Sequence, residues 1–155
     1  MSDVYLKFGF TSEAAQLLET ELGNSLLAFG ALDERMLSGA PDKKWAADLF
    51  ADINRQTLGQ LIRNATRNTE ALRGIEPLLS KALDERNRLA HRFFPQHNFR
   101  RNSDEGRAIM LKDLELIHDV VLEAYKAVML LSGVDLDALA KEGEREIPPT
   151  KHLPI

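Results

Sequence analysis

Hydrophobic and polar positions along this chain repeat at helical spacing, and no useful stretch alternates with a period of two. A first helix is predicted over residues 12–37, with Thr11 or Ser12 as its N-cap. Its apolar positions recur every three or four residues and are Leu17, Leu18, Leu22, Leu26, Phe29 and Leu32. Residues 1–10 have a mixed pattern that favours an extended lead, and residues 38–41 have the composition of a turn.

A second helix is predicted over residues 42–67. Its buried side consists of Trp45, Leu49, Ile53, Leu58, Leu61 and Ile62. Gly59 stands in the middle of this pattern, where glycine costs about 1 kcal/mol relative to alanine. It indicates either close packing against another helix or a break between two shorter helices. Residues 64–69 are polar and are expected to form a loop.

A third helix is predicted over residues 75–93, with Pro77 in its first turn and Pro95 ending it. Its expected apolar face is Leu79, Leu83, Ala90 and Phe94. A fourth helix begins at a cap formed by Asn102, Ser103 or Asp104, and continues to about Leu131 before Gly133. Its apolar stripe is Ile109 or Met110, then Leu114, Ile117, Val121, Tyr125 and Val128.

A short helix over residues 136–141 completes the pattern, and the charged, proline-containing residues 144–155 are expected to be a flexible tail. The predicted fold class is all-α. We expect an up-and-down bundle of four longer helices plus a short C-terminal helix, forming a single domain over residues 1–143.

The composition narrows the class of protein. The chain has 155 residues, of which 44% are hydrophobic and 28% charged, as in ordinary globular proteins. The sequence contains no cysteine, which excludes disulfides, thiolate metal sites and cysteine nucleophiles. No apolar run approaches the roughly 18 residues that span a bilayer, and no secretory signal is visible. These features predict a cytoplasmic protein without a membrane partner.

Positive charge is concentrated in one part of an acidic chain. The net charge of −4 argues against nucleic-acid binding through bulk charge. However, residues 86–107 contain six Arg, no Lys and only Asp104 and Glu105 as acids, a local balance of +4. Arg suits bidentate contacts with phosphate. The alternative is that these Arg side chains pair with acids on neighbouring helices.

The most informative stretch is residues 84–95, at the end of the third predicted helix. Asn87 and His91 are four residues apart and share one helical face, and Arg88 and Arg92 share a second. A histidine beside an amide and guanidinium groups is suited to phosphate chemistry. Alternatively, the Asn–His pair satisfies loop carbonyls, and a charged histidine is favoured at a helix C-terminus.

The segment from Arg86 to His91 resembles the signature of HEPN domains, which is an Arg, a polar residue, three further residues and a His. The order of predicted helices resembles this family as well. Many members are metal-independent endoribonucleases of toxin–antitoxin and phage-defence systems. The resemblance implies that two copies pair around one cleft, and that an RNA 2′-OH attacks the adjacent phosphate to give a 2′,3′-cyclic phosphate.

Within that resemblance, the residue types suggest roles. His91 titrates near neutrality, as a general acid or base must, and Arg86 offers a fixed charge to the developing phosphorane. Asn87 orients His91 or a phosphate oxygen. The expected substrate contacts are Arg88, Arg92, Arg100 and Arg101. Arg86 and His91 lie about 140° apart around an ideal helix, so convergence needs the reach of Arg, a partner chain or an opened last turn.

No cofactor or metal is predicted. His91 and His97 lack the spacing of a helical metal pair, and the motif Glu115-x-x-His118 occurs once, whereas a di-metal bundle needs it on two helices. The expected partners are a second copy, RNA and an antitoxin protein. The alternative function is a non-catalytic helical dimer that serves as a protein or nucleic-acid interaction module.

Overall fold

The computed structural model describes residues 1–31 and 43–142, and these contain helices and no strand. The all-α prediction is therefore confirmed for the described chain. The predicted turn at 38–41, the end of the first predicted helix and the predicted tail lie outside the described residues. The elements are α1 (Ser2–Ala31), α3 (Lys43–Asn54), α4 (Leu58–Asn68), α5 (Glu70–Gly74), α6 (Glu76–His91), α7 (Phe93–Gln96), the 3₁₀ helix η1 (Arg100–Asn102), α8 (Asp104–Leu131) and α9 (Leu136–Glu142).

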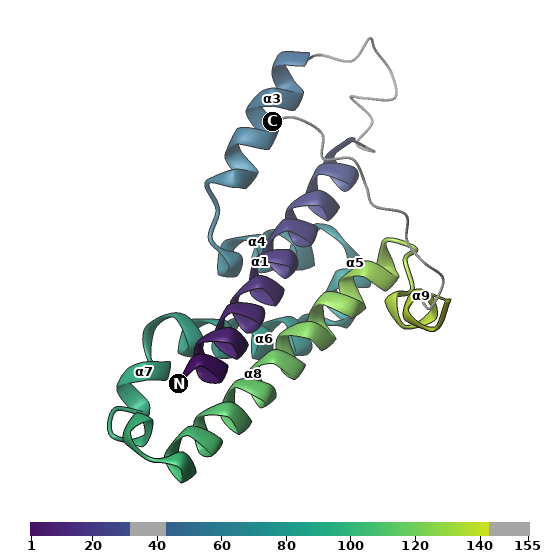
Figure 1. Cartoon of the computed structure of the whole chain (residues 1–155). Helices are drawn as coiled ribbons and strands as arrows, with labels where there is room; N and C mark the ends of the chain where they lie inside the picture. The colour runs from purple at the N-terminus through teal and green to yellow at the C-terminus, as the bar shows by residue number, and fades with distance from the viewer. Residues whose placement is uncertain (32–42, 143–155) are drawn as a thin grey trace, which may run out of the picture.

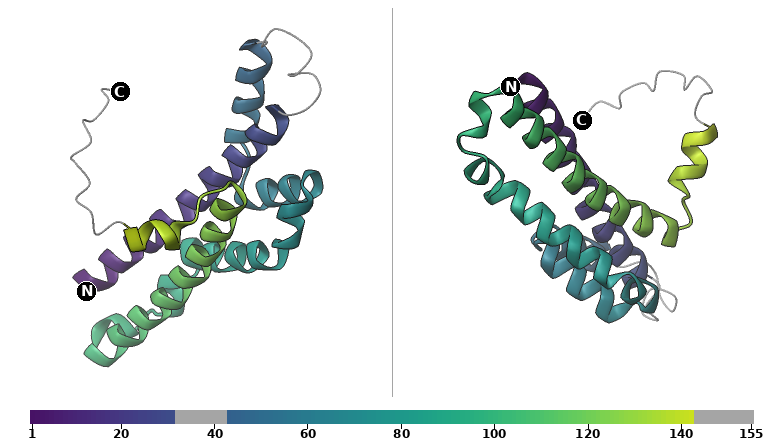
Figure 2. Two further views of the ribbon diagram at one scale, coloured as in Figure 1. Left: turned by 90° about the vertical axis from the view of Figure 1, so that its right-hand side faces the viewer. Right: turned by 90° about the horizontal axis from the view of Figure 1, so that it is seen from below.

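The two longest helices, α1 and α8, pack side by side and run in the same direction, while α6 runs the opposite way against α8 (Figures 1 and 2). Their shared core is aliphatic, because each helix presents a fully buried stripe to the others. These buried residues include Leu18, Leu22, Leu79, Leu114, Ile117 and Val121. Near the end of α8, Ser132 Oγ donates a hydrogen bond to Glu21 Oε1 of α1 at 3.1 Å.

The first helix begins ten residues earlier than the sequence pattern indicated, since α1 starts at Ser2 and residues 2–10 are helical rather than extended. Thr11 and Ser12 do not cap it. Instead, their hydroxyls donate to the carbonyl oxygens four residues earlier, Lys7 O and Phe8 O, both at 2.8 Å. Val4 is buried together with Thr11, so the buried stripe of α1 extends into the segment that we expected to be a lead.

The second predicted helix is two helices, α3 and α4, so the chain does break shortly before Gly59, as one of the two interpretations of that glycine expected. The break has a local cause. Thr57 caps α4 with a capping box in which Thr57 Oγ1 accepts from Gln60 N, and Gln60 Oε1 accepts from Thr57 N. Residues 64–68, expected to form a loop, are the last turn and a half of α4.

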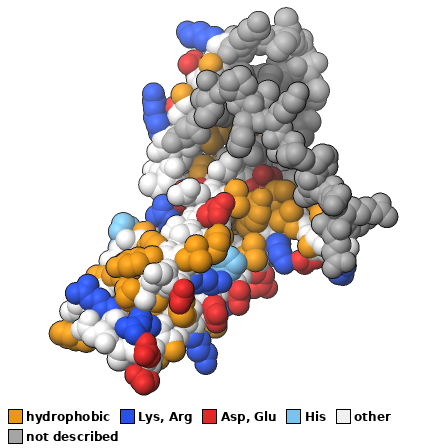
Figure 3. All heavy atoms as spheres, in the orientation of Figure 1, with side chains coloured by type: hydrophobic (Ala, Val, Ile, Leu, Met, Phe, Trp, Pro, Cys, Tyr) orange, Lys and Arg blue, Asp and Glu red, His pale blue; other side chains and the backbone are white. Residues whose placement is uncertain are grey.

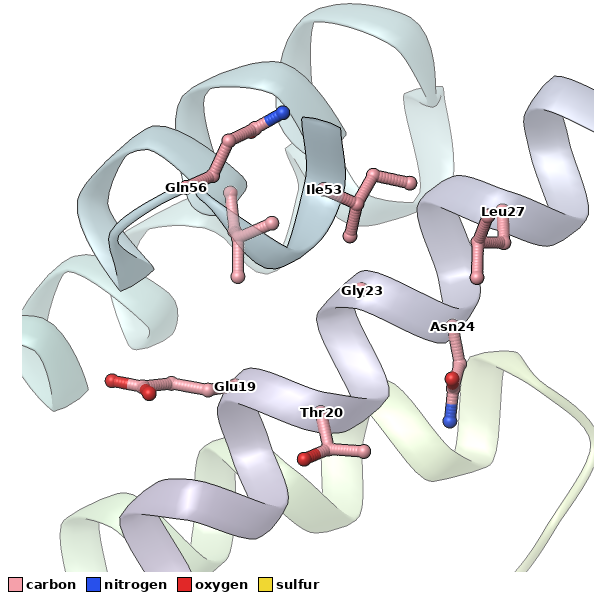
Figure 4. Close-up of a pocket in the computed structure, with 8 residues that line it drawn as sticks. Glu19, Thr20, Gly23, Asn24, Leu27, Ile53 and Gln56 are labelled. Carbon is pink, nitrogen blue, oxygen red and sulfur yellow. The ribbon is translucent and has the colours of Figure 1, made fainter. Parts of the chain in front are cut away.

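The glycines of α1 and α4 also mark close helix contacts. A Cβ on Gly23 would lie 3.2 Å from Ile53 Cγ2 of α3, and a Cβ on Gly59 would lie 3.3 Å from Leu83 Cδ2 of α6. Figure 4 shows Ile53 projecting toward α1 at Gly23. Beside this contact is an open hollow of about 250 Å³ that Glu19, Thr20 and Asn24 of α1 also line.

The buried stripe of α6 is displaced from the predicted one. Leu79, Ala82, Leu89 and Phe93 are buried, whereas Ala90 and Phe94 are exposed, so the predicted face over those two residues is wrong. The true stripe follows spacings of three, seven and four. Arg86 falls in its gap, midway between Ala82 and Leu89, and therefore faces the neighbouring helices rather than solvent.

Helix α6 ends at His91, two residues before the predicted end at residue 93. Arg92 leaves helical geometry with φ −128° and ψ −16°, and the chain restarts as the four-residue helix α7. Pro95 could not continue α6, because it has no N–H for the His91 carbonyl and its ring would clash with that carbonyl. In the first turn of α7 the missing N–H is harmless, so Phe94 is helical after all.

The boundaries of α8 agree with the sequence prediction. Ser103 is the N-cap, with Ser103 Oγ accepting from Gly106 N at 3.0 Å. At the other end, Gly133 has a φ of 87°, Gly133 N donates to Leu130 O, and Val134 N donates to Met129 O. Of the two alternatives for the first buried position, Met110 is buried and Ile109 is exposed. The predicted short helix is α9.

Candidate functional site

The outer face at the end of α6 carries three of the predicted site residues. Asn87, His91 and Arg92 are exposed. Together with Asp84, Glu85 and Arg88 they line an open hollow of about 690 Å³. The spacing predicted that Asn87 and His91 would share a face, and the helix places them so, because four residues make about one turn. His91 is the last residue of α6.

Arg86 lies on another side of α6 and does not line that hollow. Arg86 Nη2 forms an ion pair with Glu19 Oε1 of α1 at 2.7 Å, and both side chains are about one-third exposed. Arg86 Nη1 donates to Asn87 Oδ1 at 3.3 Å. The structure therefore brings Asn87 and His91 together on one face and directs Arg86 toward α1. Arg86 remains connected to the motif through the amide of Asn87.

Arg88 ties α6 to α8 instead of standing free for a substrate. Its guanidinium donates to both carboxylate oxygens of Asp113, with Nη1–Oδ2 at 2.8 Å and Nη2–Oδ1 at 2.9 Å. Arg88 Nε also donates to Glu85 Oε2 at 2.8 Å. Because the pair is bidentate and about three-quarters buried, it fixes the orientation of the C-terminal half of α6.

A buried histidine extends this network. His97, only 3% exposed, lies with Nε2 at 2.7 Å from Asp113 Oδ2, and its Nδ1 lies 2.9 Å from Arg100 Nη1. An Arg guanidinium has donors and no acceptor, so Arg100 must donate and His97 Nδ1 must accept. His97 Nε2 therefore carries the proton that is donated to Asp113. In this arrangement His97 is neutral.

The network changes the pKa of both members of its central ion pair. The hydrogen bonds that Arg88 donates to Asp113 raise the pKa of Arg88 above its already high usual value, against the opposing effect of burial. For Asp113, burial acts to raise the pKa, but the hydrogen bonds from Arg88 and His97 outweigh it and hold the pKa below its usual value. Asp113 is therefore a carboxylate at neutral pH.

A second open hollow, of about 410 Å³, adjoins the first. Arg88 lines both hollows. The lining of the second hollow is Arg88, Gln96, His97, Arg100, Ile109, Lys112, Asp113 and Leu116. At the end of the molecule where α1 begins and where α7 leads into α8, the face shown in Figure 3 carries hydrophobic side chains with both basic and acidic side chains among them.

The six Arg side chains of residues 86–107 divide into three groups. Arg86 pairs with Glu19 of α1 and Arg88 with Asp113 of α8, which are acids on neighbouring helices as the alternative interpretation expected. Arg107 pairs with Asp104 of its own helix, α8. Arg100 contacts neutral His97. Arg92 and Arg101 are exposed, and within residues 1–31 and 43–142 neither side chain has a hydrogen-bonding or ionic partner. Of the four predicted substrate contacts, Arg88 is the one already committed to carboxylates.

The sequence analysis missed Asp113 and did not connect His97 to the motif. One signal for Asp113 was present. It lies three residues after Met110 and four before Ile117, so it stands at the edge of the apolar stripe of α8, where an acid needs a partner. The contact with Arg88 joins residues 25 apart in sequence, and helical spacing does not encode contacts of that range.

Among the described residues no group of three or more His, Asp or Glu side chains is arranged to hold a metal ion. The same part of the chain includes no helix with the length and hydropathy needed to cross a membrane. In comparisons with known proteins, no family model, no curated protein and no solved structure matches the chain.

Proposed function

We propose that this chain is a HEPN-like, metal-independent endoribonuclease in which His91 transfers the proton. The observation that carries the proposal is the position of His91. It is exposed at the end of α6, one turn from exposed Asn87, next to Arg92, in an open hollow. The proposed setting is a toxin–antitoxin or defence system, and the proposed assembly is a homodimer that forms one cleft from two such faces.

The reaction requires a base for the RNA 2′-OH and an acid for the departing 5′-oxygen. An imidazole fits this requirement, because it holds or releases a proton near neutral pH. Attack of the 2′-oxygen on phosphorus forms the P–O2′ bond, and the P–O5′ bond breaks. The 2′-OH proton leaves to a base and a proton reaches the 5′-oxygen, so the products are a 2′,3′-cyclic phosphate and a 5′-OH.

The contacts of Arg86, Arg88 and Arg92 suggest a different role for each. Arg92 is the exposed cation next to His91, and it is suited to stabilise charge on the phosphorane. Arg86 acts through Asn87, because its guanidinium joins the Asn87 amide to Glu19. Arg88 sets the orientation of α6 through Asp113. In the proposed homodimer, the same residues of the second copy would add further positive charge to the shared cleft.

The experiment that tests the proposal is incubation of the purified protein with mixed RNA in EDTA. We expect cleavage that survives chelation and leaves cyclic phosphate ends. His91→Ala should lower the rate by at least about 10²-fold, since general acid–base groups contribute roughly 10²–10⁴-fold. RNA affinity should stay nearly unchanged, because His91 acts on the proton and not on the bulk charge of RNA.

Two controls keep the result interpretable. His118→Ala removes a histidine of α8 outside the motif and is expected to keep the rate. Thermal melting of each variant must show that it remains folded. Failure of the wild type to cleave any RNA, or equal rates for the wild type and His91→Ala, would remove the ribonuclease proposal.

A second candidate function is a non-catalytic helical interaction module, and one observation favours it. Arg86 and Arg88 bind α6 to α1 and α8, which is a structural use of two of the predicted site residues. This candidate predicts no cleavage at all, together with a lower melting temperature for variants of Arg88. The EDTA assay therefore separates the two functions directly.

A further inference from the structure

Arg100 is held in a defined place without being neutralised. Its described polar contact is the hydrogen bond from Nη1 to His97 Nδ1 at 2.9 Å, and His97 is an uncharged acceptor in this arrangement. Asp113 lies in the same hollow, but its oxygens already accept from Arg88 and His97. The Arg100 guanidinium therefore makes no direct contact with an acid among the described residues, and its remaining N–H groups are available.

The backbone of Arg100 is also held in place by packing and by a hydrogen bond. The short helix η1 packs on the first turn of α8, where a Cβ on Gly106 would lie 2.0 Å from Arg100 O. Only the absence of that Cβ permits the approach. Arg100 N donates to His97 O at 2.8 Å, so the main chain and the side chain of Arg100 both contact the same buried residue.

Lys112 adds a second uncompensated cation to the hollow. It is exposed on α8 and lines the hollow with Arg100, and no described acid pairs with it. Arg88 contributes little further charge, because Asp113 and Glu85 offset it. A preorganised guanidinium beside an ammonium is suited to a phosphate oxygen, since charge-assisted hydrogen bonds are stronger than neutral ones.

The residue before Arg100 is an aromatic side chain in solvent. Phe99 is 81% exposed and is the N-cap of η1. Leaving a phenylalanine in water forfeits the stabilisation that burial would give. Single-stranded nucleic acids bind to surfaces of this composition, in which bases stack on aromatic rings while cations contact the phosphates. The exposed apolar side chains of Ile109 and Leu116 border the same hollow as Arg100.

We infer that Phe99, Arg100 and Lys112 form a single-stranded RNA subsite beyond His91, in which Arg100 binds a phosphate and Phe99 stacks on a base. His97 is its positioning residue. The inference rests on the proposed function for its ligand class, and it adds a specific prediction. Arg100 and Arg101 are neighbours of equal charge, but only Arg100 is preorganised.

The test measures binding of a short, mixed-sequence 2′-O-methyl RNA by fluorescence anisotropy. This probe lacks the attacking 2′-OH, so binding is observed without cleavage. Arg100→Gln should weaken binding about tenfold, as expected for the loss of a charge-assisted contact. Arg101→Gln removes the same charge from the same short helix and should weaken binding roughly twofold. Equal losses in the two variants would overturn the role of Arg100.

The aromatic contact is tested with a matched pair of substitutions at Phe99. Phe99→Trp keeps a stacking ring, so affinity should be retained and the new indole fluorescence should be quenched by RNA. Phe99→Leu keeps an apolar side chain without the ring and should weaken binding about tenfold. If Phe99→Leu binds RNA as the wild type does, the exposed ring serves a protein partner and the RNA assignment of Phe99 is wrong.

The positioning role of His97 is tested by conservative rescue. His97→Asn keeps an acceptor near the place of Nδ1 and should hold Arg100, so RNA affinity is retained. His97→Gln keeps only the contact with Asp113 and should weaken binding about as much as Arg100→Gln does. Equal affinities of these two variants, both folded by thermal melting, would overturn the positioning role.

The two proposals fail in distinguishable ways. With cleavable RNA, His91→Ala should lower kcat and Arg100→Gln should raise KM. If the wild-type protein binds the 2′-O-methyl RNA through Arg100 but never cleaves RNA, the proposed subsite stands and the proposed ribonuclease activity is wrong. If Arg100→Gln and Arg101→Gln cleave RNA with equal efficiency, the proposed ribonuclease activity stands and the proposed subsite is wrong.

Discussion

At the scale of single residues, Asp113 joins the two helices that carry the candidate site. One carboxylate accepts both N–H groups of the Arg88 fork and the N–H of His97. Through these contacts it orients the outer face of α6 and, by way of His97, the Arg100 guanidinium. Asp113, which is not itself a predicted substrate contact, thus determines the positions of two that are, Arg88 and Arg100.

Asp113→Asn should destabilise the protein by about 2 kcal/mol at neutral pH, since it weakens hydrogen bonds between charged groups. The pKa of Asp113 is lowered in the folded state, so the unfolded state binds the proton more readily. The stabilisation is then present above the unfolded pKa of about 3.9, and it is lost as pH falls through the folded pKa. Urea unfolding from pH 7 downward should show the wild type and the variant converging below about pH 4.

Asp119→Asn is the matched control on the same helix. Asp119 is mostly exposed and lies 3.7 Å from His118, so its substitution should change stability by less than about 0.5 kcal/mol. A wild-type advantage over Asp113→Asn that stays constant down to pH 2 would contradict the lowered pKa of Asp113.

Individual site residues were predictable from sequence only as far as one helix determines them. The shared face of Asn87 and His91 follows from their spacing, and the separation of Arg86 from His91 follows from the same geometry. The partners Glu19 and Asp113 come from other helices. Their pairing depends on how the helices pack, which a periodic pattern within one segment does not contain.

At the scale of elements, the junction of η1 and α8 depends on one glycine. Gly106→Ala would place a methyl group 2.0 Å from Arg100 O and 2.7 Å from Arg100 Cα, which are backbone atoms that cannot rotate away. The clash should cost about 1–3 kcal/mol, more than the gain of roughly 1 kcal/mol in helix propensity. We expect a lower melting temperature and weaker binding of RNA, because the Arg100 segment must move.

Gly9→Ala provides the opposite expectation in the same experiment. Gly9 lies inside α1, and nothing is within 4 Å of a Cβ built on it. The variant should therefore be stabilised by about 0.5–1 kcal/mol through helix propensity. A stabilised Gly106→Ala would show that η1 does not pack on α8 as described.

Element boundaries were predictable where the signal is local. Ser103, with Asp104 and Glu105 after it, marks the start of α8, and Gly133 marks its end. The start of α1 was missed because Thr11 was read as a cap, although a threonine hydroxyl can also bond within a helix. The break before α4 was encoded by Thr57 and Gln60, a capping-box pair that the long apolar pattern obscured.

At the scale of the whole molecule, apolar side chains remain exposed on the two longest helices. They include Tyr5, Leu6 and Phe10 on α1, and Ile109, Leu116 and Leu130 on α8. Exposed apolar surface of this kind is typical of proteins that associate. Together with the proposed shared cleft, it leads us to predict a homodimer.

Light scattering at micromolar concentration should give about twice the chain mass of 17.4 kDa. A mass that stays at that of one chain over this range would remove the composite cleft, and His91 would then have to act with Arg92 alone. Substituting Leu116 with Glu tests one exposed apolar position. Dissociation in that variant would assign α8 to the interface, and an unchanged dimer would assign the interface elsewhere.

The side-by-side packing of α1 and α8 has a consequence for the order of events during synthesis. Residues 32–103 separate these helices in sequence, so their contacts have a high contact order, which slows folding more than it lowers stability. As the chain leaves the ribosome, α3, α4 and α6 can pack on α1 first, but the part of the apolar stripe of α1 that contacts α8 stays uncovered until α8 has followed. The proposed activity, which needs α6 packed against both helices, is therefore expected only after residue 131 has been translated.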